Sequence, residues 1–143
     1  MNRDMIEQVA GRLQAAAIRL ARQTRIGDEV GGLSGPRLSA LVAAVSSGPV
    51  SLAQLAAAEQ VRAPTMSRIV DALVREGLVT RETVPTDRRS VRIAPTQEGI
   101  SLLDRARKRR LRALADRLQT LGESEQRALQ RGVELFEHVS GKP

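Results

Sequence analysis

The segment PTMSRIVDALVR, residues 64–75, is the part of the sequence that most strongly indicates the fold of this chain. If it is a helix, its apolar side chains share one face at the i, i+3, i+4, i+7 spacing: Met66, Ile69, Val70 and Leu73. The opposite face carries Arg68, Asp71, Ala72 and Arg75, with Thr65 and Ser67 on its flanks. Pro64 suits a first helical turn and Gly77 suits a helix end. A helix with one apolar face and one face of arginines and hydroxyls fits a nucleic-acid groove. An ordinary solvated face is the alternative.

Composition limits the class of protein. The 143 residues are enough for one domain, and the formal net charge is +7. Of the 23 basic residues, two (Lys108 and Lys142) are lysines and the rest are arginines. Arginine forks bind phosphate bidentately, so this balance favours a nucleic-acid partner, with an acidic membrane surface as the alternative. The chain has no cysteine, no long apolar start and no apolar run of about 18 residues. We therefore expect a soluble, cytoplasmic protein.

Three helices are predicted before this segment. Apolar residues at helical spacing predict a helix over residues 4–25 and another from about Pro36, capped by Ser34, to about Ser46. A third is predicted over residues 52–58, where Ser51 and Gln54 form a capping box. A turn over residues 59–63 leads from it into residues 64–75, which is the helix-turn-helix pattern. The usual glycine of that turn is absent, so Gln60 or Glu59 must take its place.

Periodicity changes after Gly77. Residues 78–82 and 90–94 are typical of short strands. Residues 83–89 between them form a polar segment that we predict to be a loop too long for a tight hairpin turn. A two-stranded ribbon tipped with Arg88 and Arg89 resembles the wing of a winged helix, whose natural target is the minor groove or flanking phosphates. Asp87 would position these arginines by ion pairing. A solvated loop tip is the alternative.

The remainder of the chain is predicted to be helical, over residues 97–119 and 124–139. Residues 105–112 hold the densest positive charge, whose commonest explanation is a solvated helix face with some contribution to the field felt by DNA. The terminal helices carry apolar stripes with few expected partners inside a small lobe. Burying these stripes between two chains would be the economical solution, so a homodimer is expected.

Residues 33–99 resemble the MarR (multiple antibiotic resistance regulator) family in continuous order. The resemblance is carried by the following segments: Leu33-Ser34, Leu38, Leu41, residues 48–56, residues 64–73, residues 76–79, Asp87-Arg88-Arg89-Ser90 and residues 95–99. It implies a mainly α fold with a small β-hairpin, in which residues 33–96 form a winged helix-turn-helix DNA-binding lobe. Residues 1–32 and 97–143 would form a helical dimerisation region within the single domain 1–143.

The resemblance also implies the DNA contacts. Thr65, Ser67 and Arg68 would lie at the major groove of a pseudo-palindromic operator, and Arg89 would be the wing arginine with Asp87 as its partner. Arg62 stands where many members have a capping serine, so the helix lacks that cap, and Arg62 could reach a phosphate. The expected DNA-binding residues are Arg62, Thr65, Ser67, Arg68, Arg75, Thr86, Asp87, Arg88 and Arg89.

These observations predict a DNA-binding transcription regulator, most simply a repressor, whose partners are double-stranded DNA and a second copy of the chain. An enzyme is disfavoured, because His138 is the sole histidine and no nucleophile–base pair is visible. No cofactor and no metal are expected, and the identity of any small-molecule effector is open. The alternative is a basic helical interaction module or a binder of anionic membrane surfaces, although Trp and Tyr, which interfacial helices favour, are absent.

Overall fold

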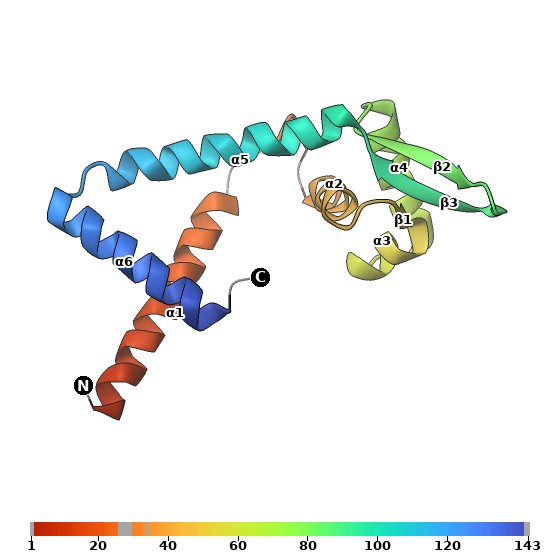
Figure 1. Ribbon diagram of the computed structural model, residues 1–143. Coiled ribbons are helices and arrows are strands. Elements are labelled where there is room, and N and C mark those ends of the chain that lie inside the picture. Colours follow the sequence, from red (N-terminus) through yellow and green to blue (C-terminus); the bar gives the residue numbers. More distant parts are fainter. Residues whose placement is uncertain (1, 26–29, 34, 142–143) are drawn as a thin grey trace. The chain divides into compact units, whose positions relative to one another are not determined.

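The computed structural model describes residues 2–25, 30–33 and 35–141, and for residues 24, 25, 88 and 89 it describes the backbone only. The chain divides into two compact units, residues 1–106 and residues 107–143. The fold is mainly α-helical with a small antiparallel sheet, as predicted (Figure 1). Among the described residues, no helix is long and apolar enough to cross a membrane.

The helices of the first unit agree with the sequence prediction to within one or two residues. They are α1 (Arg3–Arg25), α2 (Gly35–Ser47), α3 (Leu52–Ala58), α4 (Ala63–Arg75) and the start of α5 (Gln97–Leu118). The capping box predicted for α3 is present: the Ser51 hydroxyl accepts from the Gln54 N–H at 3.1 Å, and the Gln54 side chain accepts from the Ser51 N–H at 2.9 Å. Ser34, the expected cap of α2, lies outside the described residues.

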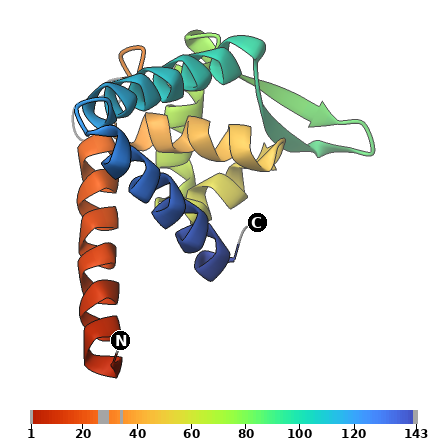
Figure 2. The ribbon, with the colours of Figure 1, turned by 60° about the vertical axis from the view of Figure 1, so that its left-hand side comes forward.

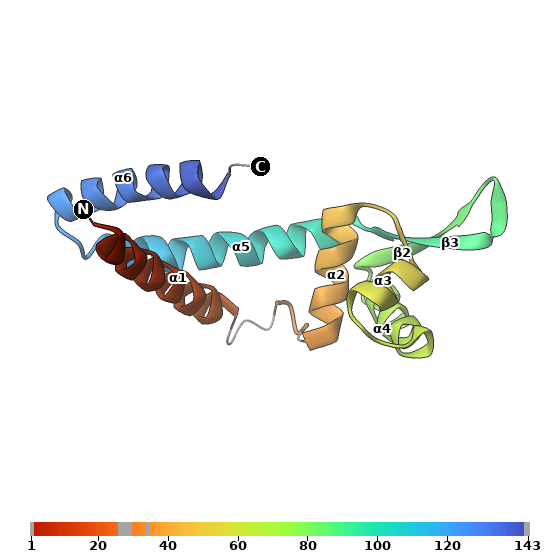
Figure 3. The ribbon, with the colours of Figure 1, turned by 90° about the horizontal axis from the view of Figure 1, so that it is seen from below.

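The core of the first unit lies between α2, α3, α4 and the sheet, and in Figure 3 these three helices lie side by side. Met66, Val70 and Leu73, on the predicted apolar face of α4, are at most 1% exposed. They pack in one cluster with residues such as Leu41 of α2 and Ile93 of the sheet. Burial of this face fixes which side of α4 remains on the surface.

The sheet has three strands in the order β1-β3-β2: β1 (Val50–Ser51), β2 (Val79–Val84) and β3 (Asp87–Pro95). Strand β1, a two-residue strand that pairs antiparallel with β3, was not predicted from the sequence. Strands β2 and β3 form a hairpin that projects from the helices of its unit (Figure 2).

The prediction of a long loop over residues 83–89 was wrong. Strand pairing continues to Val84 and Asp87, which are register partners, so the turn is reduced to Pro85 and Thr86. The register shifts between Thr83 and Val84. At this irregularity β3 contains more residues than the segment of β2 opposite it. These additional residues are polar, and they interrupt the regular alternation of the sequence pattern within the strand.

The second unit consists of the remainder of α5 and the whole of α6 (Glu123–Ser140). Helices α5 and α6 match the helices predicted over residues 97–119 and 124–139. Every residue of α6 is exposed, although the helix carries large apolar side chains. Leu129, Val133 and Phe136 are 40–49% exposed and share one face of α6 at the i, i+4, i+7 spacing. The described side chains of α1 are likewise all exposed, including Ile6, Val9 and Leu13.

Candidate nucleic-acid interface

The surface side of α4 carries most of the polar residues that the sequence singled out. Arg62, Thr65, Arg68 and Arg75 are exposed, and Ser67 is half-buried. Arg62 occupies the N-cap position in an extended conformation and makes no capping hydrogen bond with its side chain, as expected. The arginine guanidinium at this helix start therefore remains available to a partner outside the chain.

Arg81 of β2 connects the hairpin to α4. Its Nη2 donates to Asp71 Oδ1 at 2.6 Å, to the Ser67 hydroxyl at 3.3 Å and to the Ser67 carbonyl oxygen at 3.4 Å. This role of Arg81 was not predicted from the sequence. Strand alternation could have indicated one, because Arg81 is the register partner of buried Ile93 and therefore shares the face of the hairpin that meets the core.

The carboxylates at α4 are neutralised by arginines from other elements. Asp71 pairs with Arg81, and Glu76, the C-cap of α4, accepts from Arg37 Nη1 of α2 at 2.8 Å. By contrast, Arg62, Arg68 and Arg75 form no ion pair within the part of the chain that the structure describes. The exposed side of α4 therefore presents uncompensated positive charge, which attracts phosphate.

The hairpin tip places the other expected contact residues at one end of the sheet. Thr86 lies in the turn and Asp87 begins β3, and both are exposed. Arg88 and Arg89 follow on the β3 backbone, but their side chains lie outside the described part of the structure. The expected pairing of Asp87 with Arg89 stays a prediction.

The described residues contain no group of three or more histidine, aspartate or glutamate side chains that could hold a metal ion.

Comparison with known proteins identifies the family. The MarR family profile matches residues 33–91, a range that includes α2, the helix-turn-helix and most of the hairpin. An uncharacterized HTH-type transcriptional regulator of Mycobacterium leprae is 35% identical over 133 residues, which are 93% of each chain.

Solved structures share the fold. A transcriptional regulator of Thermotoga maritima has a TM-score of 0.81 at 19% identity, with 93% of this chain and 94% of that chain covered. A variant of MepR from S. aureus, bound to an oligodeoxyribonucleotide, has a TM-score of 0.69 at 18% identity, with 94% and 98% covered. The helix-turn-helix, the hairpin and these similarities agree: the chain belongs to the MarR family of winged helix-turn-helix transcription regulators.

Proposed function

We propose that this protein is a sequence-specific DNA-binding transcription regulator, a ligand-responsive repressor that acts as a cytoplasmic homodimer on a pseudo-palindromic operator. The observation that carries the proposal is the surface side of α4, whose other side is buried. This surface side presents Thr65 and three arginines that form no ion pair with any residue that the structure describes. The DNA-bound MepR variant, which has the same fold, supports a nucleic-acid partner.

In this proposal α4 is the recognition helix and lies in the major groove. Arg68 would bind a guanine edge or a phosphate, and Thr65 and Ser67 would donate to base or phosphate oxygens. Arg81 occupies an acceptor position of the Ser67 hydroxyl, whose own O–H can still donate to a base. Arg62 and Arg75, near the two ends of the helix, would bind phosphates and fix its position.

The hairpin would act as the wing. Arg88 and Arg89 follow the turn at its tip, so they would meet the minor groove or the flanking phosphates, where negative potential attracts arginine. Thr86 and Asp87, exposed at the same tip, would orient these arginines and the backbone around them.

Homodimerisation would bring two such lobes onto successive turns of DNA. The exposed apolar faces of α1 and α6 support an assembly through the terminal regions, residues 1–32 and 97–143, because exposed side chains of this size gain from burial against a second copy. Two-fold symmetry would place the recognition helices about 34–36 Å apart. A dimer seated on a promoter would block transcription, and an effector that changed this separation would release it.

Selection of bound duplexes from random DNA tests the proposal most directly. The expected result is an inverted repeat with half-sites about one helical turn apart. Fluorescence anisotropy of the selected duplex should show an affinity that falls steeply with salt, because several arginines release counterions from phosphates. A shuffled duplex of equal length is the control.

Vesicles of neutral and anionic lipid separate the two classes of partner. Retention on anionic vesicles without preference for the selected duplex would favour the alternative of a membrane-surface binder. It would contradict the proposed function.

A further inference from the structure

The end of α4 and the start of α5 are fastened to each other through the two residues that follow α4. Gly77 has a φ of 71°, and its N–H donates to the Val74 carbonyl at 3.0 Å. The Leu78 N–H donates to the Leu73 carbonyl at 2.9 Å. These two bonds close the C-terminus of α4 as a Schellman motif and fix the directions of the Gly77 and Leu78 carbonyl groups.

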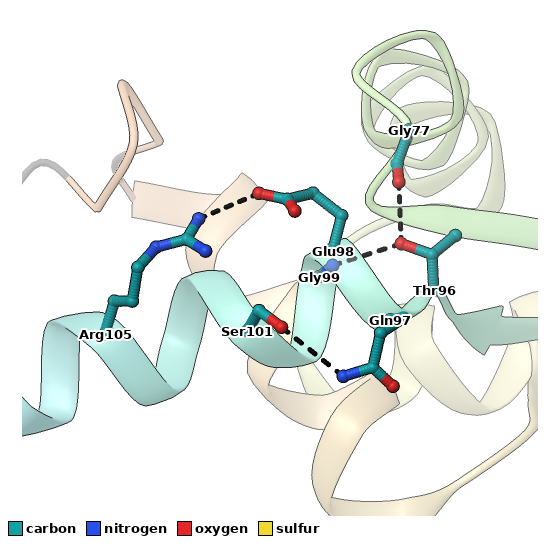
Figure 4. A network of polar contacts seen from close by, with 7 residues as sticks. All are labelled: Gly77, Thr96, Gln97, Glu98, Gly99, Ser101 and Arg105. Atoms are coloured by element: carbon teal, nitrogen blue, oxygen red, sulfur yellow. Dashed lines mark hydrogen bonds and ion pairs between the residues drawn. The ribbon is translucent and has the colours of Figure 1, made fainter.

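Thr96 binds both of these carbonyl groups from the other side (Figure 4 shows its hydroxyl contacts). Its hydroxyl donates to the Gly77 oxygen at 2.6 Å, and its N–H donates to the Leu78 oxygen at 3.0 Å. The same hydroxyl accepts from the Gly99 N–H at 3.1 Å, which satisfies an N–H of the first turn of α5. One threonine thus caps α5 and ties it to the end of α4.

Gly99 allows the two helix ends to lie in direct contact. A Cβ at this position would overlap the Leu78 carbonyl oxygen and would lie 3.2 Å from Leu41 Cδ1. Gly99 and Leu78 are buried, and Leu41 is fully buried. The junction is therefore packed on backbone and core side chains, which leaves little room for α5 to turn relative to α4.

We propose that Thr96 and Gly99 are positioning residues that make the recognition helix and the start of α5 move as one body. They would thereby determine how strictly the protein discriminates between half-site spacings. This inference rests on the proposed function, in which α5 leads into the helices that join the two copies. A base pair inserted between half-sites moves one of them by about 3.4 Å and turns it by about 35°. A rigid junction cannot follow that displacement, whereas a loosened one can.

Substitution of Thr96 tests the role directly. Thr96→Val preserves the shape of the side chain and removes the hydroxyl, and Thr96→Ser retains the hydroxyl. Anisotropy would be measured on the selected duplex, on duplexes with one or two base pairs inserted at its centre, and on a single half-site. We expect wild type and Thr96→Ser to lose about tenfold or more in affinity per insertion. Thr96→Val should lose only about threefold, with unchanged half-site affinity.

Ser51→Ala is the matched control, because it removes the cap of α3 in the same unit without touching the junction. It should retain the wild-type spacing profile, and Gly99→Ala should relax the profile as Thr96→Val does. A wild-type profile for a Thr96→Val protein with wild-type circular dichroism would overturn the positioning role. Equal relaxation by Ser51→Ala would also overturn it.

The failure of the proposed function is a separate outcome. If the selection yields no duplex that wild type binds more tightly than the shuffled control, the proposed function fails and the positioning role fails with it. If wild type binds the selected duplex but tolerates the insertions, the positioning role alone is overturned.

Discussion

At the scale of single residues, the charge of α4 is arranged by its neighbours. Asp71 and Glu76 are held by arginines of β2 and α2, so the arginines on the surface of α4 face no competing carboxylate of their own helix. Intramolecular pairing thus separates structural arginines, such as Arg37 and Arg81, from those that can meet a partner.

Arg68→Ala tests the central contact. If Arg68 reads a guanine, its loss should weaken operator binding by about 1–3 kcal/mol and relax the preference at one base pair. Anisotropy titrations against the operator and against single-base variants measure both effects. Arg131→Ala on α6 removes the same charge from an exposed site and is the control. An equal loss on every sequence would instead assign Arg68 to a phosphate.

The Arg81–Asp71 pair is expected to orient the hairpin relative to α4 and to contribute little to the free energy of unfolding. Its side chains are 34% and 50% exposed, and ion pairs at such sites are coupled by about 0.2–1 kcal/mol. A double-mutant cycle of Arg81→Gln and Asp71→Asn, measured by urea unfolding, should give a coupling within that range. The same cycle in operator affinity should show both single variants weakened, because each loosens the attachment of the wing to α4. Additive effects in both measurements would contradict this role.

The sequence predicted which residues of α4 are buried and which lie on the surface, but it did not predict the contacts that they make. Helical periodicity separated Met66, Val70 and Leu73 from Arg68 and Arg75, because burial of one helix face is a local pattern. The bond from Arg81 joins residues ten apart on different elements. It depends on the twist and register of the hairpin, which single-sequence periodicity does not determine.

At the scale of elements, the turn between α3 and α4 shows how a missing glycine is replaced. Gln60 adopts a φ of 53°, and α3 ends in the bond pattern of a Schellman motif, from the Gln60 N–H to the Ala57 carbonyl and from the Val61 N–H to the Ala56 carbonyl. The sequence restricted this position to Gln60 or Glu59. The structure identifies Gln60 as the residue in the left-handed conformation.

Gln60→Gly should stabilise the protein. The left-handed conformation costs a non-glycine residue about 1–2 kcal/mol, whereas glycine loses about 0.5–1 kcal/mol through greater backbone freedom when unfolded. The net gain should be about 0.5–1 kcal/mol. It is measurable by urea unfolding at fixed protein concentration. Gln60→Ala keeps the backbone penalty and should leave the unfolding midpoint nearly unchanged, and a larger gain from alanine than from glycine would refute the explanation.

The hairpin proposed as the wing differs most from its sequence prediction. Two strand-like segments with a basic sequence between them predicted a hairpin with a basic tip. The length of its turn was predicted wrongly, because the ends of the strands depend on pairing across the hairpin. Strand β1 could not be predicted from periodicity, because two residues are too few to show a repeating pattern and its pairing with β3 is a tertiary contact.

Arg89→Ala tests the wing as a unit. Because Arg89 follows the hairpin turn on β3, its loss should weaken operator binding by about tenfold while leaving the oligomeric state unchanged. Anisotropy and sedimentation velocity measure the two quantities. Arg107→Ala on α5, in the other unit, is the charge-matched control. Unchanged affinity of Arg89→Ala would remove the wing from the proposed interface.

At the scale of the whole molecule, the distribution of apolar surface separates the core of the first unit from the terminal helices α1 and α6. The first unit has a continuous core around Leu41 and Met66, whereas α6 contributes no buried residue. A shallow groove of the second unit is lined by Ala115 and Leu118 of α5 and by Leu129 and Val133 of α6. An isolated chain would leave this surface in water at a cost of about 25 cal/mol for each Å². A second copy is the partner that we propose for it.

Phe136→Glu should therefore separate the dimer. Phe136 is 44% exposed on the apolar face of α6, and a buried, unpaired carboxylate there would oppose association. Sedimentation velocity at micromolar concentration should show a monomer, and affinity for the two-site duplex should fall by about 10²–10⁴ while half-site affinity is retained. His138→Glu places the same charge on the opposite face of α6 and should remain dimeric. A dimeric Phe136→Glu protein with full operator affinity would require the two copies to meet through another surface. In that case the apolar faces of the terminal helices would have to be explained by a different partner.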